Sequence, residues 1–99
     1  MTRGTTPTHT FKIPFDTSNV REAMVIYAQN DTEVFRKETH ECEFSGNKIS
    51  VTLEQEETLK LSHRCNVQIQ LRILTQDGKA LASAVKVVGV QQCLNDEVL

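Results

Sequence analysis

The sequence predicts an all-β protein, a single immunoglobulin-like antiparallel β-sandwich of about seven strands. Apolar side chains recur at every second position through most of the 99 residues, which is the period of a half-buried strand. Turn-forming pairs such as Gly46-Asn47 and Asp77-Gly78 separate the apolar runs, at the spacing of about 8–12 residues that is typical of sandwiches and barrels. No helix-length segment carries a 3.6-residue period, which disfavours a parallel α/β sheet.

The chain divides into a short leading segment and one domain. Residues 1–8 (MTRGTTPT) offer nothing to bury and predict a flexible N-terminal arm. Residues 9–99 form the predicted sandwich domain. Its first strand is indicated by residues 11–15 (FKIPF), where apolar and polar side chains alternate and Pro14 marks a sheet edge or a strand end.

The next segments alternate between turns and strands. Residues 16–19 (DTSN) are turn formers, because their side chains bond to nearby backbone. Residues 21–28 (REAMVIYA) are apolar on both faces and rich in β-branched and aromatic residues, which favours a central strand. Asn30-Asp31 then predicts a turn, and residues 33–37 a short strand.

The middle of the chain predicts a β-hairpin followed by a connection from one sheet to the other. Cys42 and Phe44 share one side of a short strand, which is expected to face the core. Residues 45–48 (SGNK) predict the hairpin turn, and residues 49–53 (ISVTL) alternate cleanly after it. The helix-like patch at 54–58 (EQEET) is too short for a stable helix and predicts a single turn that crosses between the sheets.

The last third contains the clearest strand. Residues 67–73 (VQIQLRI) alternate without interruption, and Asp77-Gly78 after them is a strong hairpin signal. Residues 80–90 then predict one long closing strand. Because this strand is apolar on both faces, we expect it to lie centrally or to have its outer face covered.

Charge and hydropathy exclude several classes of partner. Eleven basic and thirteen acidic residues give a net charge of −2, and the sequence has no cluster of basic residues that would bind the phosphates of a nucleic acid. The acidic run Glu54-Gln55-Glu56-Glu57 is interpreted as a solvated turn, since a calcium loop would need alternating acidic ligands. No stretch approaches the roughly 18 apolar residues of a membrane span, and no signal peptide is evident, so we expect an intracellular, soluble protein without membrane contact.

Two His-x-Cys pairs are the only candidates for a metal site. His40 with Cys42, and His63 with Cys65, would each lie on one face of a strand and together offer four zinc ligands. Structural zinc sites usually hold their ligands on tight knuckles, so these four residues are weak candidates and we expect no metal. A Cys42–Cys65 disulfide would need an oxidising compartment. An odd number of cysteines favours free thiols instead, with Cys93 the most exposed.

The chain lacks the marks of an enzyme. No cysteine or serine lies in the context of an activated nucleophile, and the glycines are scattered singly, without a phosphate-binding loop. We therefore expect no catalysis and no cofactor. Phe35-Arg36-Lys37 is the only candidate for stacking on nucleic acid, and a solubilised edge strand is the favoured interpretation.

Self-association has some support in the closing strand and the tail. One phase of the closing strand carries Ala82, Ala84, Val88 and Val90 and the other carries Leu81, Val85 and Val87. Only one of these faces can lie inside the sandwich. The other must be covered by the tail or by another chain, and the sequence does not choose between them. The predicted interaction residues are Val88, Val90, Leu94, Val98 and Leu99.

Four stretches give the chain a wider resemblance. These are HTFKIPFD, ISVTLEQEETLKL, VQIQLRILTQDGKALAS and VGVQQCLNDEVL, within residues 9–99. In them the chain resembles a family of small uncharacterised proteins of phages and prophages from Gram-positive (Firmicutes) gut bacteria. The resemblance implies a virion structural or assembly role near the tail or baseplate. It places the protein in the virion or the host bacterial cytoplasm, with other phage structural proteins or itself as partners. A looser likeness, in architecture alone, is to the amino-terminal sandwich domains of upper baseplate proteins.

Two other functions stay open from the sequence. A carbohydrate- or surface-binding module would need an aromatic platform, for which only Tyr27 and Phe35 are available. A small zinc-binding protein would use the two His-x-Cys pairs.

Overall fold

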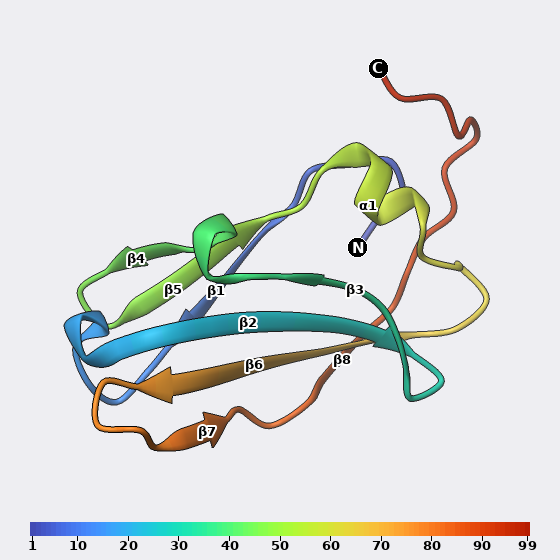
Figure 1. Ribbon diagram of the computed structural model, residues 1–99. Coiled ribbons are helices and arrows are strands. Elements are labelled where there is room, and N and C mark those ends of the chain that lie inside the picture. Colours follow the sequence, from blue (N-terminus) through green and yellow to red (C-terminus); the bar gives the residue numbers. More distant parts are fainter.

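The computed structural model describes all 99 residues and confirms an all-β sandwich, with eight strands where about seven were predicted (Figure 1). The strands are β1 (Thr8–Lys12), β2 (Val20–Gln29), β3 (Thr32–Lys37), β4 (Glu43–Ser45), β5 (Lys48–Thr52), β6 (Val67–Thr75), β7 (Ala80–Ala82) and β8 (Lys86–Val88). The helices are the 3-10 turns η1 (Thr17–Asn19) and η2 (Thr39–Glu41) and the α-helix α1 (Gln55–Leu59).

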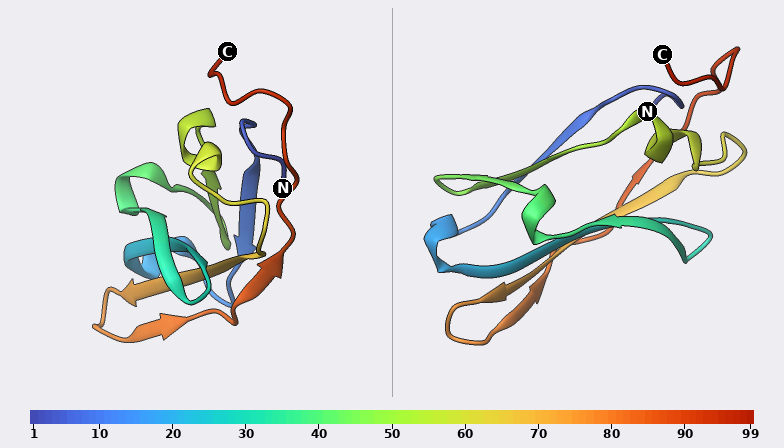
Figure 2. Two further views of the ribbon diagram at one scale, coloured as in Figure 1. Left: turned by 90° about the vertical axis from the view of Figure 1, so that its right-hand side faces the viewer. Right: turned by 45° about the horizontal axis from the view of Figure 1, so that its top comes forward.

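The strands form two antiparallel sheets that face each other (Figure 2). The smaller sheet has the order β1-β5-β4. In the larger one β3, β2 and β6 are neighbours, and β7 and β8 share the far edge of β6. Helix α1 connects β5 of one sheet to β6 of the other, so the predicted crossing is confirmed. No helix of the structure has the length and apolar character needed to cross a membrane.

The turns form where their residues predict them. Asn30 and Asp31 both have positive φ, at 51° and 61°, and join β2 to β3 by a two-residue turn that matches the twist of the strands. Gly46 and Gly78 have φ of 58° and 85° in the β4–β5 and β6–β7 hairpins. These are left-handed conformations that glycine adopts without penalty.

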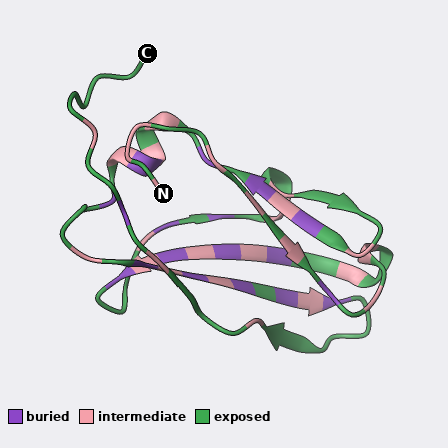
Figure 3. Cartoon of the chain, turned by 180° about the vertical axis from the view of Figure 1, so that it is seen from behind, coloured by how far each residue is buried: buried purple, intermediate pink, exposed green.

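The core lies between the sheets and is built from the inward-facing residues that the alternation predicts. Along β2, β5 and β6, buried and more exposed residues alternate, as Figure 3 shows. The buried apolar side chains are Ile13, Ala23, Val25, Tyr27, Phe35, Ile49, Val51, Leu53, Leu61, Val67, Ile69, Leu71, Ile73 and Val90.

The predicted long strand over residues 80–90 is wrong, because the chain is broken at Ser83. The Ser83 hydroxyl accepts the N–H of Leu71 at 3.0 Å and donates to the carbonyl of Ala84 at 3.0 Å. A side-chain oxygen thus takes over a bond of the sheet ladder, and the strand divides into β7 and β8. The segment lies at the sheet edge and not centrally, and Leu81, Val85 and Val87 remain exposed.

The leading segment also differs from the predicted flexible arm. Thr2 forms a parallel bridge with Gln91, Arg3 donates its N–H to the Gln91 carbonyl at 3.1 Å, and Gln91 donates to the Met1 carbonyl at 2.7 Å. Further along, the Pro7 carbonyl accepts from Leu53 at 2.9 Å, which extends the pairing of β1 with β5. These contacts are backbone hydrogen bonds to the distant end of the chain, which local composition does not predict.

Arg3 fixes the leading segment to the end of α1. Its side chain is 16% exposed and donates to the carbonyls of Leu61 and Leu59 at 2.8 and 2.9 Å and to the Asp96 carboxylate at 2.8 Å. Carbonyls beyond a helix C-terminus lack helical partners, and a guanidinium has enough donors to satisfy several of them.

Substituting Arg3 by methionine is therefore expected to lower the free energy of unfolding by about 1–3 kcal/mol, because two backbone carbonyls lose a charged donor. Urea unfolding measures this loss, and amide hydrogen exchange should become faster over residues 1–5. The exposed Arg64 serves as a matched control through Arg64→Met. Unchanged exchange over residues 1–5 in the Arg3 variant would contradict this anchoring role.

Candidate protein-interaction site

An apolar groove opens on one side of the sandwich, between β1 and the β7–β8 segment. We call it the β1 groove. Residues 10–15 line one wall and residues 81–84 and Lys86 the other, with Leu71 and Ile73 at the floor. It encloses about 540 Å³, and eight of its thirteen lining residues are hydrophobic. Figure 2 shows β1 and β8 on one side of the sandwich and β3 on the opposite side.

The backbone of β1 is unpaired along this groove. The register pairs His9 with Val51 and Phe11 with Ile49. Hydrogen bonds at both ends of this register, from Leu53 to Pro7 and from Ile13 to Asn47, show that odd-numbered residues of β1 bond to β5. In an antiparallel pair the alternate residues direct their N–H and C=O groups away. The amides of Thr8, Thr10 and Lys12 therefore form a free strand edge.

The side chains of β1 also alternate between two faces: those of the odd-numbered residues point to the core and those of the even-numbered residues point to the outer face. His9, Phe11 and Ile13 face inward, where Ile13 is buried and Phe11 packs against the core. On the outer face, Thr8 and Thr10 bond hydroxyl to hydroxyl with Thr52 and Ser50, at 2.9 and 3.0 Å. The hydroxyl groups on the outer face already have hydrogen-bond partners. The groups of β1 that remain free to bind another molecule are therefore the backbone amides along its edge.

The groove is electropositive. Its lining includes Lys12 and Lys86 and contains no acidic residue. The charge of Lys86 extends to β1: burial lowers the pKa of His9, and the N-terminal ammonium and Lys86 lower it further. An occupant with acidic groups would therefore be favoured.

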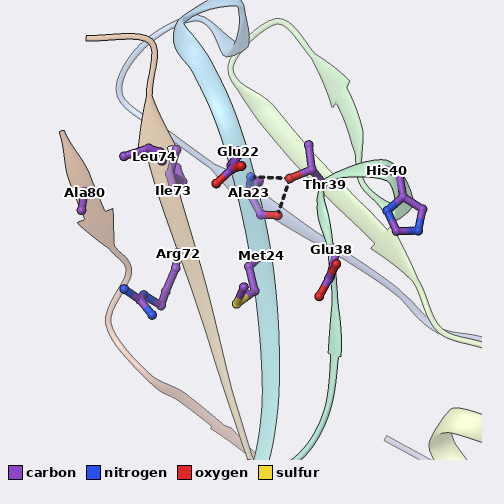
Figure 4. Close-up of a pocket in the computed structure, with 10 residues that line it drawn as sticks. All are labelled: Glu22, Ala23, Met24, Glu38, Thr39, His40, Arg72, Ile73, Leu74 and Ala80. Carbon is purple, nitrogen blue, oxygen red and sulfur yellow. Dashed lines mark hydrogen bonds between the residues drawn. The ribbon is translucent and has the colours of Figure 1, made fainter. Parts of the chain in front are cut away.

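A second concave surface lies on the outer face of the five-stranded sheet (Figure 4). It encloses about 400 Å³ and is lined by side chains of β2, β6, β7 and the η2 turn. The Thr39 hydroxyl accepts the N–H of Ala23 and donates to its carbonyl, both at 3.1 Å, and so fixes η2 against β2. No ion pair or hydrogen bond joins the charged side chains of Glu22, Glu38 and Arg72, which extend separately from their elements.

The structure does not place the four candidate zinc ligands on strands, as the sequence argument assumed. His40 lies in the η2 turn and Cys42 just after it, while His63 and Cys65 lie in the connection between α1 and β6. Neither pair is on a strand, so the argument from shared faces does not hold. No three or more His, Cys, Asp or Glu side chains converge anywhere in the structure.

All three cysteines are free thiols, as the sequence predicts. Burial, and next the Glu41 carboxylate, raise the pKa of the Cys42 thiol. Cys42 packs against the core as expected, whereas Phe44 stays 39% exposed because β4 is an edge strand. Cys93 is half-buried and not the exposed thiol that its position predicts.

The five predicted interaction residues separate into two groups. Val90 is a buried core residue, and Val88 is partly buried and packs against the core. Leu94 and Leu99 are fully exposed, and Val98 is half exposed. The tail therefore does not cover the closing strands.

The two aromatic residues considered for a carbohydrate-binding platform are both buried. Tyr27 is completely buried and Phe35 is 8% exposed. Their rings stack at a centroid distance of 4.7 Å inside the core. This placement also rules out Phe35 as a base-stacking residue.

A buried ion-pair cluster closes the side of the sandwich opposite the β1 groove. The Lys37 ammonium, on β3, lies 2.7 Å from the Glu57 carboxylate on α1 and 3.4 Å from Glu41 of η2. Burial opposes the charged form of Lys37, but the hydrogen bond and charge of Glu57, together with Glu41, raise its pKa above the ordinary value. Sequence interpretation missed this cluster, although Lys37 shares the inward phase of Phe35.

His9 connects β1 to the core through Tyr27. Its Nδ1 lies 2.7 Å from the Tyr27 hydroxyl. Burial, with smaller contributions from Glu57 and Cys42, raises the pKa of Tyr27, so the phenol keeps its proton. Which of the two groups donates in this hydrogen bond depends on the tautomer of the His9 imidazole.

The lowered pKa of His9 predicts a loss of stability in mild acid. The unfolded chain binds a proton at His9 more readily than the folded chain does. The contribution of neutral His9 to the free energy of unfolding is therefore fully present above its unfolded pKa of about 6.5, and it is lost as pH falls through the lower pKa of the folded state. Urea midpoints at pH 7.5 and 5.5 measure this difference, which His9→Gln should reduce. His63→Gln, at an exposed position, is the control, and an equal reduction there would contradict the assignment.

Comparison of the chain with protein-family models, curated proteins and solved structures finds no match.

Proposed function

We propose that the chain is a non-catalytic interaction module that receives an extended segment of a partner protein in the β1 groove. The observation that carries the proposal is the free edge of β1. The amides of Thr8, Thr10 and Lys12 are unpaired beside an apolar groove. An added strand would hydrogen-bond to this edge and insert alternate side chains between the sheets.

The asymmetry of the sandwich supports this proposal. On the β3 side, Lys37, Glu41 and Glu57 bridge the two sheets. On the β1 side no ion pair bridges them, and the apolar side chains of Phe11, Phe15 and Leu81 line an open groove. Natural proteins usually protect a free edge beside apolar surface, since it promotes aggregation. A partner strand would provide that protection.

We propose that the setting is the one implied by the resemblance, a phage virion or its assembly pathway near the tail or baseplate. The partners would be other structural proteins or a second copy of this chain, with no cofactor, nucleic acid or membrane involved. Mass spectrometry of purified particles from an induced lysogen tests this role. The protein should be present at a fixed ratio to the tail proteins, and its absence from both particles and assembly intermediates would contradict the proposal.

Peptide selection tests the groove itself. A displayed library of random peptides is selected on the purified chain and then tested on Ala84→Asp, which puts a charge and extra bulk into the groove wall. Val85→Asp is the matched control, because Val85 is the adjacent, half-exposed residue outside the lining. We expect apolar, strand-forming peptides that bind the native chain and Val85→Asp but not Ala84→Asp. If every selected peptide binds all three proteins equally, the groove is not the binding site.

A further inference from the structure

We propose that the segment bound in the β1 groove is the C-terminal segment, residues 94–99 (LNDEVL), of a second copy of this chain. This inference rests on the proposed function and specifies its partner. It follows from the exposure, charge and position of the segment.

The C-terminal segment exposes its apolar side chains to solvent. Leu94 and Leu99 are fully exposed and Val98 is 49% exposed. The bonds that hold the segment to its own chain are polar. They run from Arg3 to the 65% exposed Asp96 carboxylate, from the Cys93 thiol to Asn95 and Asp96, and between Gln55 and the backbone of Leu99. Water can replace such bonds at little cost, so the segment is available to another molecule.

The charges of segment and groove are complementary. Asp96 and Glu97 give the C-terminal segment a charge of −2, which equals the net charge of the whole chain. The groove carries Lys12 and Lys86 and no acidic residue. Juxtaposition of the two would neutralise both, and opposite charges at a rim favour encounter and register.

The position of the C-terminal segment, away from the groove of its own chain, favours a second copy as the molecule that it binds. In Figure 1 and Figure 2 it leaves the sandwich beside α1, while β7 and the end of β1 that line the groove lie toward the other end. Six extended residues span about 20 Å, enough to cover the roughly 13 Å from Thr8 to Lys12. A tail-to-groove contact joins two different surfaces, so it closes into a twofold dimer when two copies exchange tails reciprocally and builds rings or filaments when they do not.

The alternation of the segment fits a strand inserted at this edge. In extended conformation Leu94, Asp96 and Val98 point to one face. The two apolar side chains would enter the groove, and the carboxylate between them would meet its lysines. The backbone would pair with the free amides of β1.

The first experiment measures self-association. Sedimentation velocity from about 10 µM to 1 mM should show a mass that grows with concentration, as expected for a weak contact. The variant Leu94→Ser/Val98→Ser, which removes only exposed apolar groups, should weaken association at least about tenfold. Thr6→Ser/Thr52→Ser is the control at exposed positions outside the segment and the groove. A strict monomer over the whole range would overturn the inference.

The second experiment tests the strand mode with a synthetic peptide of residues 92–99 that carries Cys93→Ser. Binding is followed by NMR shifts of the ¹⁵N-labelled chain, expected at Thr8, Thr10, Lys12 and residues 81–86. Single N-methylation along the peptide should abolish binding at alternate positions only, because every second amide bonds to β1. Uniform tolerance of N-methylation would overturn the strand mode.

A charge exchange tests the register. Lys86→Glu should weaken binding of the native peptide, and a peptide with Asp96→Lys should bind Lys86→Glu better than it binds the native chain. No recovery in this pair would overturn the proposed alignment of acid with lysine.

The two proposals fail differently. If the peptide of residues 92–99 does not bind but library peptides bind in a manner lost in Ala84→Asp, the groove receives another protein, and the inference about the second copy is wrong. If neither binds, the proposed function is wrong as well.

Discussion

Replacing Lys37 by methionine is expected to lower the free energy of unfolding by about 3 kcal/mol, because it leaves two carboxylates without their counter-ion at the junction of the sheets. The Lys37 side chain is 5% exposed and that of Glu57 15% exposed, so water replaces the lost contacts poorly. Urea unfolding at pH 7 measures the loss. The double variant Lys37→Met/Glu57→Leu should recover most of it, since an apolar pair of similar volume removes both charges together.

Arg36 provides the matched control for this experiment. It is adjacent on β3 and also ion-paired, to Glu33 at 2.9 Å, but both side chains are exposed. Arg36→Met should cost no more than about 1 kcal/mol, as is usual for surface pairs. Equal losses in the two variants would show that burial of the Lys37 cluster does not matter for stability.

The same cluster predicts an alkaline limit. The pKa of Lys37 is raised in the folded state, so its contribution to stability is complete below the unfolded value of about 10.4 and is lost as pH rises through the folded value. Lys37→Met should unfold with less pH dependence above pH 10 than the native chain.

Substituting Tyr27 by alanine is expected to cost about 4 kcal/mol, because it empties a ring-sized space at the centre of the core. Tyr27 is completely buried, its ring stacks on Phe35, and its hydroxyl is hydrogen-bonded to His9. Tyr27→Phe separates these contributions. It retains the ring and should cost only about 1 kcal/mol, since one hydrogen bond is lost.

Thermal or urea unfolding of both Tyr27 variants tests this partition, with Phe44→Ala as the control for an aromatic side chain at an exposed edge. That control should cost well under the loss in Tyr27→Ala. If Tyr27→Phe were as damaging as Tyr27→Ala, the hydrogen bond to His9, and not ring packing, would dominate at this position.

Tyr27 and Lys37 connect the stability of the domain to the side on which we propose that it binds a partner. Tyr27 lies between Phe35 on β3 and His9 on β1, so packing at the core centre positions the inward face of the free strand. Lys37 fixes the opposite side through α1 and η2. With one side closed and the core packed, the β1 edge can remain open without loss of the fold.

Local chemistry determined most of the strands and turns. The alternation over residues 49–53 and 67–73 places the same side chains in the core that the period of two predicts. Asn30-Asp31, Gly46 and Gly78 make their turns because they accept positive φ. These features depend on neighbouring residues only, and they are therefore readable from the sequence by itself.

The features that depend on distant partners were decided by the tertiary structure. Ser83 breaks the closing strand by bonding to Leu71, Arg3 anchors the leading segment at the end of α1, and Lys37 meets Glu57 across the two sheets. The β1 groove belongs to the same class, because it exists only where the edge of one sheet faces the interrupted edge of the other. Period and turn chemistry fix which way a side chain points along a strand, whereas the packing of the sheets determines what it meets.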